Sequence, residues 1–172
     1  MTGVLTIPES IDIIPNNAFK GCTGLTKINI PNSVTKILNN AFDGCTGLTG
    51  NLVLPNNLIE IRTYAFRGCR GLTGTLLFPI SMGSIQGSSF QNCSAFSTLI
   101  LHSGISSICG AAFMGCTFST VNVYRIAAPS VSSNGLALNG SARPLHIPIA
   151  NSGYNVAPWT TETIFSSIVA DL

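Results

Sequence analysis

Cysteine is the residue type in this chain with the most obvious capacity for chemistry, and its spacing is regular. The 172 residues contain six cysteines and two histidines. Five of the cysteines recur at nearly constant steps along the chain, and a phenylalanine stands three positions before each of them. These five are Cys22, Cys45, Cys69, Cys93 and Cys116. Six cysteines in an exported chain normally suggest disulfide bonds.

The regular spacing favours buried free thiols over disulfides. If each cysteine occupies the same place in successive coils of a repeat, the side chains point inward in parallel. Successive coils are close enough for bridging by Cα distance, but parallel side-chain vectors conflict with the torsion that an S–S bond requires. We therefore predict an internal row of small, weakly polar side chains, with disulfide bridging as the alternative.

Cys109 lies outside this row and is expected to be more exposed. His102 precedes it by seven residues. A cysteine beside a histidine can act as a nucleophile. However, the sequence suggests no third orienting group and no oxyanion site, and the two residues fall on different parts of a coil. An enzyme that uses Cys109 is thus the least favoured of three hypotheses.

No other residues have the spacing of a catalytic, metal or cofactor site. The chain has no C-x-x-C pair and no phosphate-binding or dinucleotide fingerprint. Its six carboxylates are scattered, and Glu9 and Asp12, the closest pair, fall in a connection. We predict no catalytic residues, no cofactor and no metal, and hence a protein that is not an enzyme.

The charge content disfavours nucleic acid and membranes as partners. Eight basic and six acidic side chains give a net charge of +2, without a run of like charge. No stretch approaches the roughly 20 apolar residues of a membrane span. Arg62, Arg67 and Arg70 lie within one repeat. They form either a solvated ridge or a site for an acidic partner.

The elements that position these residues follow from the same repeat. Ala-Phe or Ser-Phe occurs five times, at Phe19, Phe42, Phe66, Phe90 and Phe113. Isoleucine stands five residues before each phenylalanine. An alternating run such as Leu25–Pro31 follows each cysteine and predicts a half-buried strand. In the next copy, Leu52 and Leu54 before Pro55 predict the same strand.

Each repeat also contains a short segment such as Asn16–Gly21, which predicts a single helical or 3₁₀ turn. One strand and one turn cannot bury their own apolar side chains, so the units must stack. The expected fold is an α/β solenoid, a right-handed superhelix with one parallel sheet and short turns opposite it. Residues 1–124 would form about five units, each of roughly 23–24 residues.

The motif Ala-Phe-x-x-Cys-x-x-Leu-x-x-Ile-x-Ile-Pro resembles that of the BspA-like leucine-rich-repeat surface protein family. The resemblance implies a location outside the cell or on the bacterial cell surface, in a secreted or anchored protein. After Tyr124 the repeat spacing is lost. Residues 125–172, which include Tyr154 and Trp159, resemble the C-terminal capping segment of such arrays. Val4–Pro8 is already a repeat strand, so we expect this chain to be the C-terminal part of a longer protein.

The strands suggest a binding surface. The residue between the two inward positions of each strand should point outward, and its counterparts should form a row. The row consists of Thr6, Asn29, Val53, Leu77, Ile100 and Asn122, flanked by Lys27, Asn51, Thr75, Thr98 and Thr120. Its apolar centre and polar ends are typical of a protein-binding surface. Sheet propensity alone, or burial of this face by the rest of a longer parent protein, would also explain the row.

Two functions therefore remain. The chain is a cell-surface adhesion or interaction module that binds a protein or extracellular-matrix partner through the sheet. Alternatively, it is a spacer and cap in a larger surface protein, without a ligand of its own.

Overall fold

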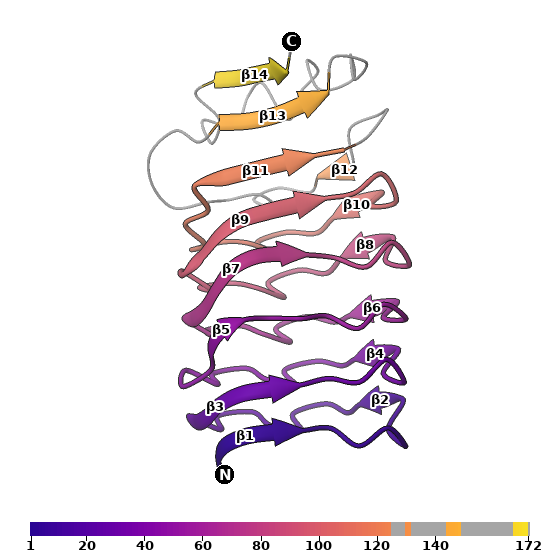
Figure 1. The fold of residues 1–172 in the computed structure, drawn as a ribbon, viewed down its shortest axis with the longest axis vertical. Coiled ribbons are helices and arrows are strands. Elements are labelled where there is room, and N and C mark those ends of the chain that lie inside the picture. The colour runs from indigo at the N-terminus through magenta and orange to yellow at the C-terminus, as the bar shows by residue number, and fades with distance from the viewer. Residues whose placement is uncertain (125–129, 132–143, 149–166, 172) are drawn as a thin grey trace.

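The chain forms a stack of parallel coils in the computed structural model, which describes residues 1–124, 130–131, 144–148 and 167–171 (Figure 1). Each of the first five coils contains one long strand, one two-residue strand and one turn that carries the phenylalanine and cysteine. The long strands within residues 1–124 are β1 (Thr2–Thr6), β3 (Gly24–Asn29), β5 (Thr49–Asn51), β7 (Gly71–Leu77), β9 (Phe96–Leu101) and β11 (Thr120–Val123). The short strands are β2 (Ile13–Ile14), β4 (Lys36–Ile37), β6 (Glu60–Ile61), β8 (Ser84–Ile85) and β10 (Ser107–Ile108).

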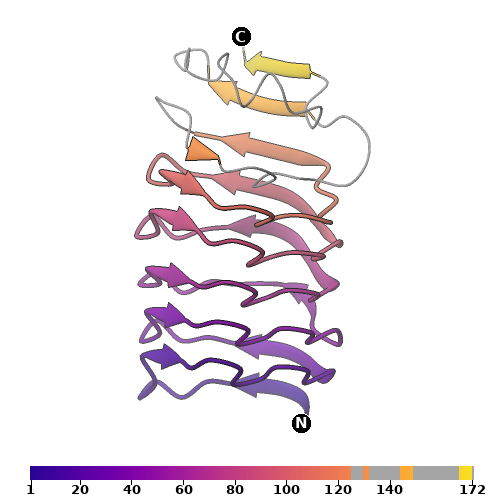
Figure 2. The same ribbon diagram turned by 180° about the vertical axis from the view of Figure 1, so that it is seen from behind.

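The two strand sides of the stack are each interrupted once. On the long side, β1 pairs with β3, and a separate six-stranded sheet runs β14-β13-β11-β9-β7-β5. On the short side, seen in Figure 2, one sheet is β2-β4-β6 and the other is β12-β10-β8. All pairs within these sheets are parallel. We number the coils from the N-terminus, so that β5 and β6 belong to coil three and β7 and β8 to coil four.

The core is a column of stacked aromatic rings between the sides. Neighbouring rings from Phe19 to Phe42, Phe66 and Phe90 lie 5.2, 5.2 and 5.3 Å apart between centroids, with interplanar angles of 10–14°. The predicted isoleucine anchors at positions 14, 37, 61, 85 and 108 are all buried. Ile11 is 37 % exposed because it belongs to the first coil of the stack, which has a neighbour on one side only.

The predicted helical turns are absent, since none of the described residues are helical. In the first turn, Asn17 and Gly21 have φ of 60° and 71°, and the equivalent positions of the next four turns are also left-handed. Two left-handed residues four positions apart prevent the consecutive right-handed conformations that a helix needs. The Phe19 amide donates to Ala41 O of the next coil at 2.8 Å. The fold is thus a parallel β-solenoid with hydrogen-bonded turns, and the predicted α/β class is not confirmed.

Coil three departs from the predicted strand. β5 ends at Asn51, and the segment Leu52–Leu54 pairs with neither neighbouring coil, although both leucine side chains are buried. Two constraints conflict here. At the start of the strand, Thr49 pairs with Gly71, and the same register continued would set Leu52 beside Gly74. The core instead places Leu52 level with the buried Leu76, two positions further along.

A one-residue bulge corrects such a mismatch elsewhere but is too small for coil three. In coil four, Gly74 has φ of 75°, and the register shifts by one residue between Gly74 and Thr75. The pairing then continues with Leu76 opposite Leu99, in agreement with the core. Gly50 is the matching left-handed residue of coil three. Between coils three and four the register would have to shift by two residues, twice the shift that one bulge provides. The strand pairing between these coils therefore stops after Asn51.

Coils three and four also lack strand pairing on the short side, where one sheet ends at β6 and the next begins at β8. Arg62 N donates to Ile37 O at 2.9 Å and Cys109 N donates to Ile85 O at 2.9 Å, but the equivalent Gln86 N has no such bond to Ile61. Coils three and four are joined at the start of the long strand and at the turn, where Phe66 N donates to Ser89 O. From Leu52 to Tyr64, no backbone hydrogen bond joins coil three to coil four. We call this the open seam.

Strand pairing continues into the segment that was predicted to cap the stack. β12 (Ser130–Val131) pairs with β10, while β13 (Pro144–Pro148) pairs with β11 and β14 (Ser167–Asp171) pairs with β13. Val121 pairs with Leu145 and Leu145 with Ile168, so the backbone keeps the step of the earlier coils beyond Tyr124. The loss of the sequence repeat after Tyr124 therefore does not end the strand pairing. Tyr154 and Trp159 lie outside the described residues, and the capping role of residues 125–172 stays a prediction.

Candidate binding surface

The outer surface of the long sheet brings most of the predicted binding residues together. The strand register places Leu77 beside Ile100 and Ile100 beside Asn122. A second row places Thr75 beside Thr98 and Thr98 beside Thr120. Leu77 is 52 % exposed, and Ile100 is half-buried. The surface thus carries an apolar row next to a row of hydroxyl groups.

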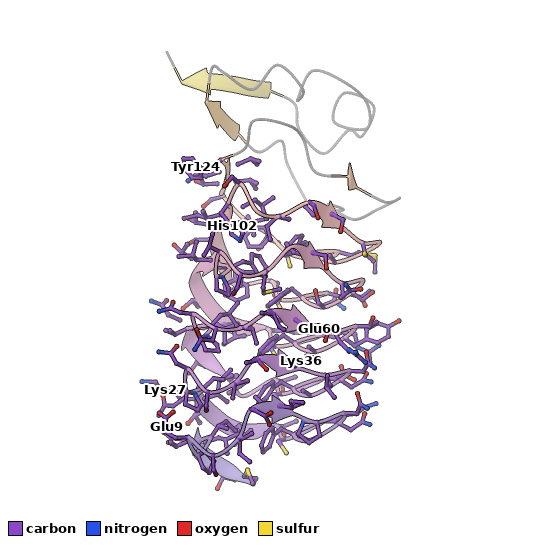
Figure 3. All side chains as sticks on the ribbon, turned by 90° about the vertical axis from the view of Figure 1, so that its right-hand side faces the viewer. Glu9, Lys27, Lys36, Glu60, His102 and Tyr124 are labelled. Atoms are coloured by element: carbon purple, nitrogen blue, oxygen red, sulfur yellow. The ribbon has the colours of Figure 1, made fainter. Side chains whose placement is uncertain are left out.

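The interrupted sheet separates the remaining predicted residues from these rows. Asn29 belongs to the β1-β3 sheet, where its amide nitrogen donates to Thr6 Oγ1 at 3.3 Å. Val53 is 75 % exposed but lies in the unpaired segment of coil three. Lys27 of β3 and Glu60 of β6, labelled in Figure 3, lie on opposite sides of the stack.

A groove of about 420 Å³ lies on this surface beside the open seam. Its walls come from coil three and from β7, and its lining residues are Asn51, Leu52, Val53, Leu54, Asn56, Gly74, Thr75 and Leu77. The predicted row contained Val53 and Leu77 with their flanking residues Asn51 and Thr75. The groove between them was not predicted from the sequence. The extra glycines Gly50 and Gly74, which lengthen these two coils by one residue, were the available signal.

Four of the five regularly spaced cysteines form the predicted row of buried thiols, and Cys22 of the first coil is half-buried. All six cysteines are free. Cys45, Cys69, Cys93 and Cys116 are buried, and each thiol donates to the carbonyl oxygen of a phenylalanine in the preceding coil at 3.0–3.2 Å. Burial raises the pKa of Cys45 to about 11 and that of Cys116 to about 12. These thiols therefore stay protonated and unreactive at neutral pH.

Cys109 and His102 belong to different sides of the stack. His102 directly follows β9 on the long side, and its Nδ1 accepts a hydrogen bond from Gly104 N at 2.9 Å. Cys109 directly follows β10 on the short side and is half-buried. The strand order therefore does not bring the thiol and the imidazole together. Among the described residues, no group of three or more His, Cys, Asp or Glu side chains could hold a metal ion.

The three arginines of coil three do not form a single cationic site. Arg67 donates to both carboxylate oxygens of Asp43 at 2.8 and 2.7 Å, and the guanidinium lies 4.4 Å from the centre of the Tyr64 ring. The hydrogen bonds to Asp43 raise the pKa of Arg67. Arg62 pairs with Glu60 at 2.8 Å. Arg70 is exposed and has no ion pair within the described part of the chain.

Comparisons with known proteins agree with the repeat geometry. The family model described as BspA type leucine rich repeat region matches residues 4–120 in six copies. The matched residues run from β1 to the start of β11. A search of curated proteins found no match.

Two solved structures are similar. The leucine rich repeat protein of T. pallidum, TpLRR, has a TM-score of 0.66 and 24% sequence identity, over 98% of this chain and 85% of that chain. A leucine-rich repeat protein from Bacteroides ovatus ATCC 8483 has a TM-score of 0.47 and 17% identity, over 98% of this chain and 61% of that chain. The likeness to TpLRR supports the parallel repeat fold.

None of the described residues form a helix long and apolar enough to cross a membrane.

Proposed function

The chain belongs to the family of BspA-type leucine-rich repeats, and on this premise we propose that it is a non-enzymatic module that binds a protein partner through the long sheet. Families with this repeat fold are generally non-enzymatic and have interaction or structural roles. BspA-like proteins are typically associated with the cell surface. An extracellular-matrix or host surface protein is accordingly the class of partner that we propose, with adhesion as the outcome.

The exposed apolar row is the observation that carries this proposal. Val53 and Leu77 are 75 % and 52 % exposed, and Ile100 continues the row. Exposed β-branched and leucine side chains cost solubility, and an apolar centre with a rim of Asn and Thr is typical of a protein interface. The parallel ladder holds Leu77 and Ile100 in place before binding, which lowers the entropic cost of association.

The test is capture of extracellular-matrix and host surface proteins on the immobilised chain. We expect the Leu77→Glu, Ile100→Glu double variant to lose the partner that the unaltered chain retains, because two carboxylates would be buried at the interface. A matched control is Ile13→Glu, Ile59→Glu. These residues are 38 % and 49 % exposed and belong to, or directly precede, short strands away from the long sheet.

Equal capture by the folded double variant and the unaltered chain would exclude the long sheet as the binding surface. If no partner is captured at all, the alternative function gains support, in which the repeats are a spacer and cap within a larger surface protein. Folding of every variant is checked by its unfolding midpoint in urea.

A further inference from the structure

The Leu52–Leu54 backbone of coil three pairs with neither neighbour, whereas the equivalent residues of the other long strands pair with at least one neighbouring strand. Within the described part of the chain, the backbone groups of Leu52, Val53 and Leu54 form no hydrogen bond with other backbone groups. Their repeat equivalents Leu99, Ile100 and Leu101 pair along their whole length with β11. Peptide N–H and C=O groups need a hydrogen-bond partner, and a strand edge without one is a template for another strand.

The unpaired segment is also accessible. The groove of about 420 Å³ lies between Leu52–Leu54 and Thr75–Leu77, within the roughly 300–1,000 Å³ typical of ligand sites. On the side of β7 that faces coil three, pairing with β5 ends at Thr73. The groove thus combines a free backbone edge with two exposed apolar side chains, Val53 and Leu77, beside it.

We propose that this groove binds an extended polypeptide segment, which adds as a strand to the unpaired backbone of Leu52–Leu54. Only another backbone supplies alternating N–H donors and C=O acceptors at the spacing of a strand, about 3.3 Å per residue. The apolar side chains of the segment, at alternate positions, contact Val53 and Leu77. This inference rests on the proposed function, because it specifies the class of partner and the place on the long sheet.

Three further features agree with a strand at this place. Neither Val53 nor Leu54 has to break a hydrogen bond within the chain when a peptide pairs with it. No aspartate, glutamate, lysine or arginine lines the groove, so a neutral segment meets no unpaired charge. Coils three and four have no backbone hydrogen bonds from Leu52 to Tyr64, so widening of the seam breaks no backbone bond and affects only the bonds of the Ser81 hydroxyl to Asn56 O and Leu58 O.

The experiment uses the hexapeptide acetyl-Thr-Val-Thr-Val-Thr-Val-amide and amide hydrogen exchange of the full chain. Without peptide, the amides of Val53 and Leu54 should exchange rapidly. Because neighbouring residues direct their N–H groups to opposite edges, only one of these two amides can donate to a strand in the groove. At saturating peptide we expect the exchange of that one amide, Val53 or Leu54, to slow at least about tenfold, whereas the amide of Ile100 serves as an internal reference that is already paired.

Two N-methylated peptides separate backbone pairing from side-chain contact. One carries methyl groups on the three valine nitrogens and the other on the three threonine nitrogens. Successive residues of the peptide strand also direct their N–H groups to opposite edges, so at least one methylated peptide must lose the protection of the Val53 or Leu54 amide that the unmethylated peptide gives. Retention by both, or no protection by the unmethylated peptide, overturns the proposal. Protection that rises with protein concentration alone also overturns it, because a second copy then fills the groove.

The outcome is separable from that of the capture experiment. A partner that depends on Leu77 and Ile100 but leaves the amides of Val53 and Leu54 unprotected supports the proposed function and refutes the strand. Protection by the peptide without any captured protein supports the strand and refutes the broader function.

Discussion

At the scale of single residues, left-handed backbone positions limit where the turns can form. Asn, Tyr, Ser and Ala occupy the position before each Ala-Phe or Ser-Phe pair, with φ between 56° and 61°. A left-handed conformation costs an ordinary L residue roughly 1–2 kcal/mol, and asparagine tolerates it best. Tyr64 and Ala111 are therefore the least suited to their positions.

Replacing Ala111 by glycine should stabilise the fold. Relief of the left-handed strain exceeds the extra chain entropy of glycine, and we expect a gain of about 0.5–1 kcal/mol. Urea unfolding of Ala111→Gly measures it. The control is Ala112→Gly, one residue further on, which is buried and has ordinary φ, and which should lower stability. Equal losses in both variants would contradict a strained Ala111.

The buried thiols predict a pH dependence of stability. The pKa of Cys116 rises from its ordinary 9.0 to about 12 because burial disfavours the thiolate. Above pH 9 the unfolded thiol loses its proton while the folded one keeps it. The stability that the neutral thiol contributes is therefore complete below pH 9 and is lost progressively between pH 9 and about 12.

Comparison of the unaltered chain with Cys116→Ala isolates this contribution. In urea unfolding above pH 9, the stability of the unaltered chain should fall more steeply, by up to about 1.4 kcal/mol per pH unit. Parallel curves for the two proteins would mean that Cys116 is not shielded from solvent in the folded state.

At the scale of the elements, stacking between coils provides the stability that no coil has alone. Phe66 is fully buried between Phe42 and Phe90, whereas Phe19 is half-buried and stacks on Phe42 alone. Phe66→Ala should cost about 3–5 kcal/mol through lost transfer energy and a cavity. Phe19→Ala should cost less, because solvent can fill the space. A loss below about 1 kcal/mol for Phe66→Ala, measured by urea unfolding, would contradict its central place in the column.

At the scale of the whole molecule, the open seam divides the stack into coils one to three and the coils from four onward. In a repeat array, local opening is easiest where neighbouring units share the fewest bonds. The Gln86 amide lacks the bond that its equivalents Arg62 and Cys109 form. We expect Gln86 to exchange at least about tenfold faster than either equivalent, as one lost hydrogen bond implies. Similar protection at all three positions would show that the seam is closed in solution.

Local side-chain pattern was sufficient to predict the repeat, the inward column and the outward row. The phenylalanines and cysteines recur at an almost constant step, and a periodic core requires that equivalent side chains stack. For the same reason Leu77, Ile100 and Asn122 lie side by side as predicted, as do Thr75 and Thr98. Whether these residues bind a partner stays a prediction.

What the tertiary structure decided depends on relations between coils. The segment Asn16–Gly21 was predicted to form a single helical or 3₁₀ turn, but Asn17 and Gly21 are left-handed, Phe19 N bonds to the next coil and no helix forms. The single inserted glycines, Gly50 and Gly74, are small local changes in the sequence. Their effect depends on how far the strand register departs from the alignment of the buried side chains in the neighbouring coil. A departure of one residue is absorbed by a bulge, as at Gly74, whereas a departure of two residues ends the pairing after Asn51. Periodicity therefore determined which side chains point inward and outward, and the register between coils, which no single repeat contains, decided where the backbone is left without a partner strand.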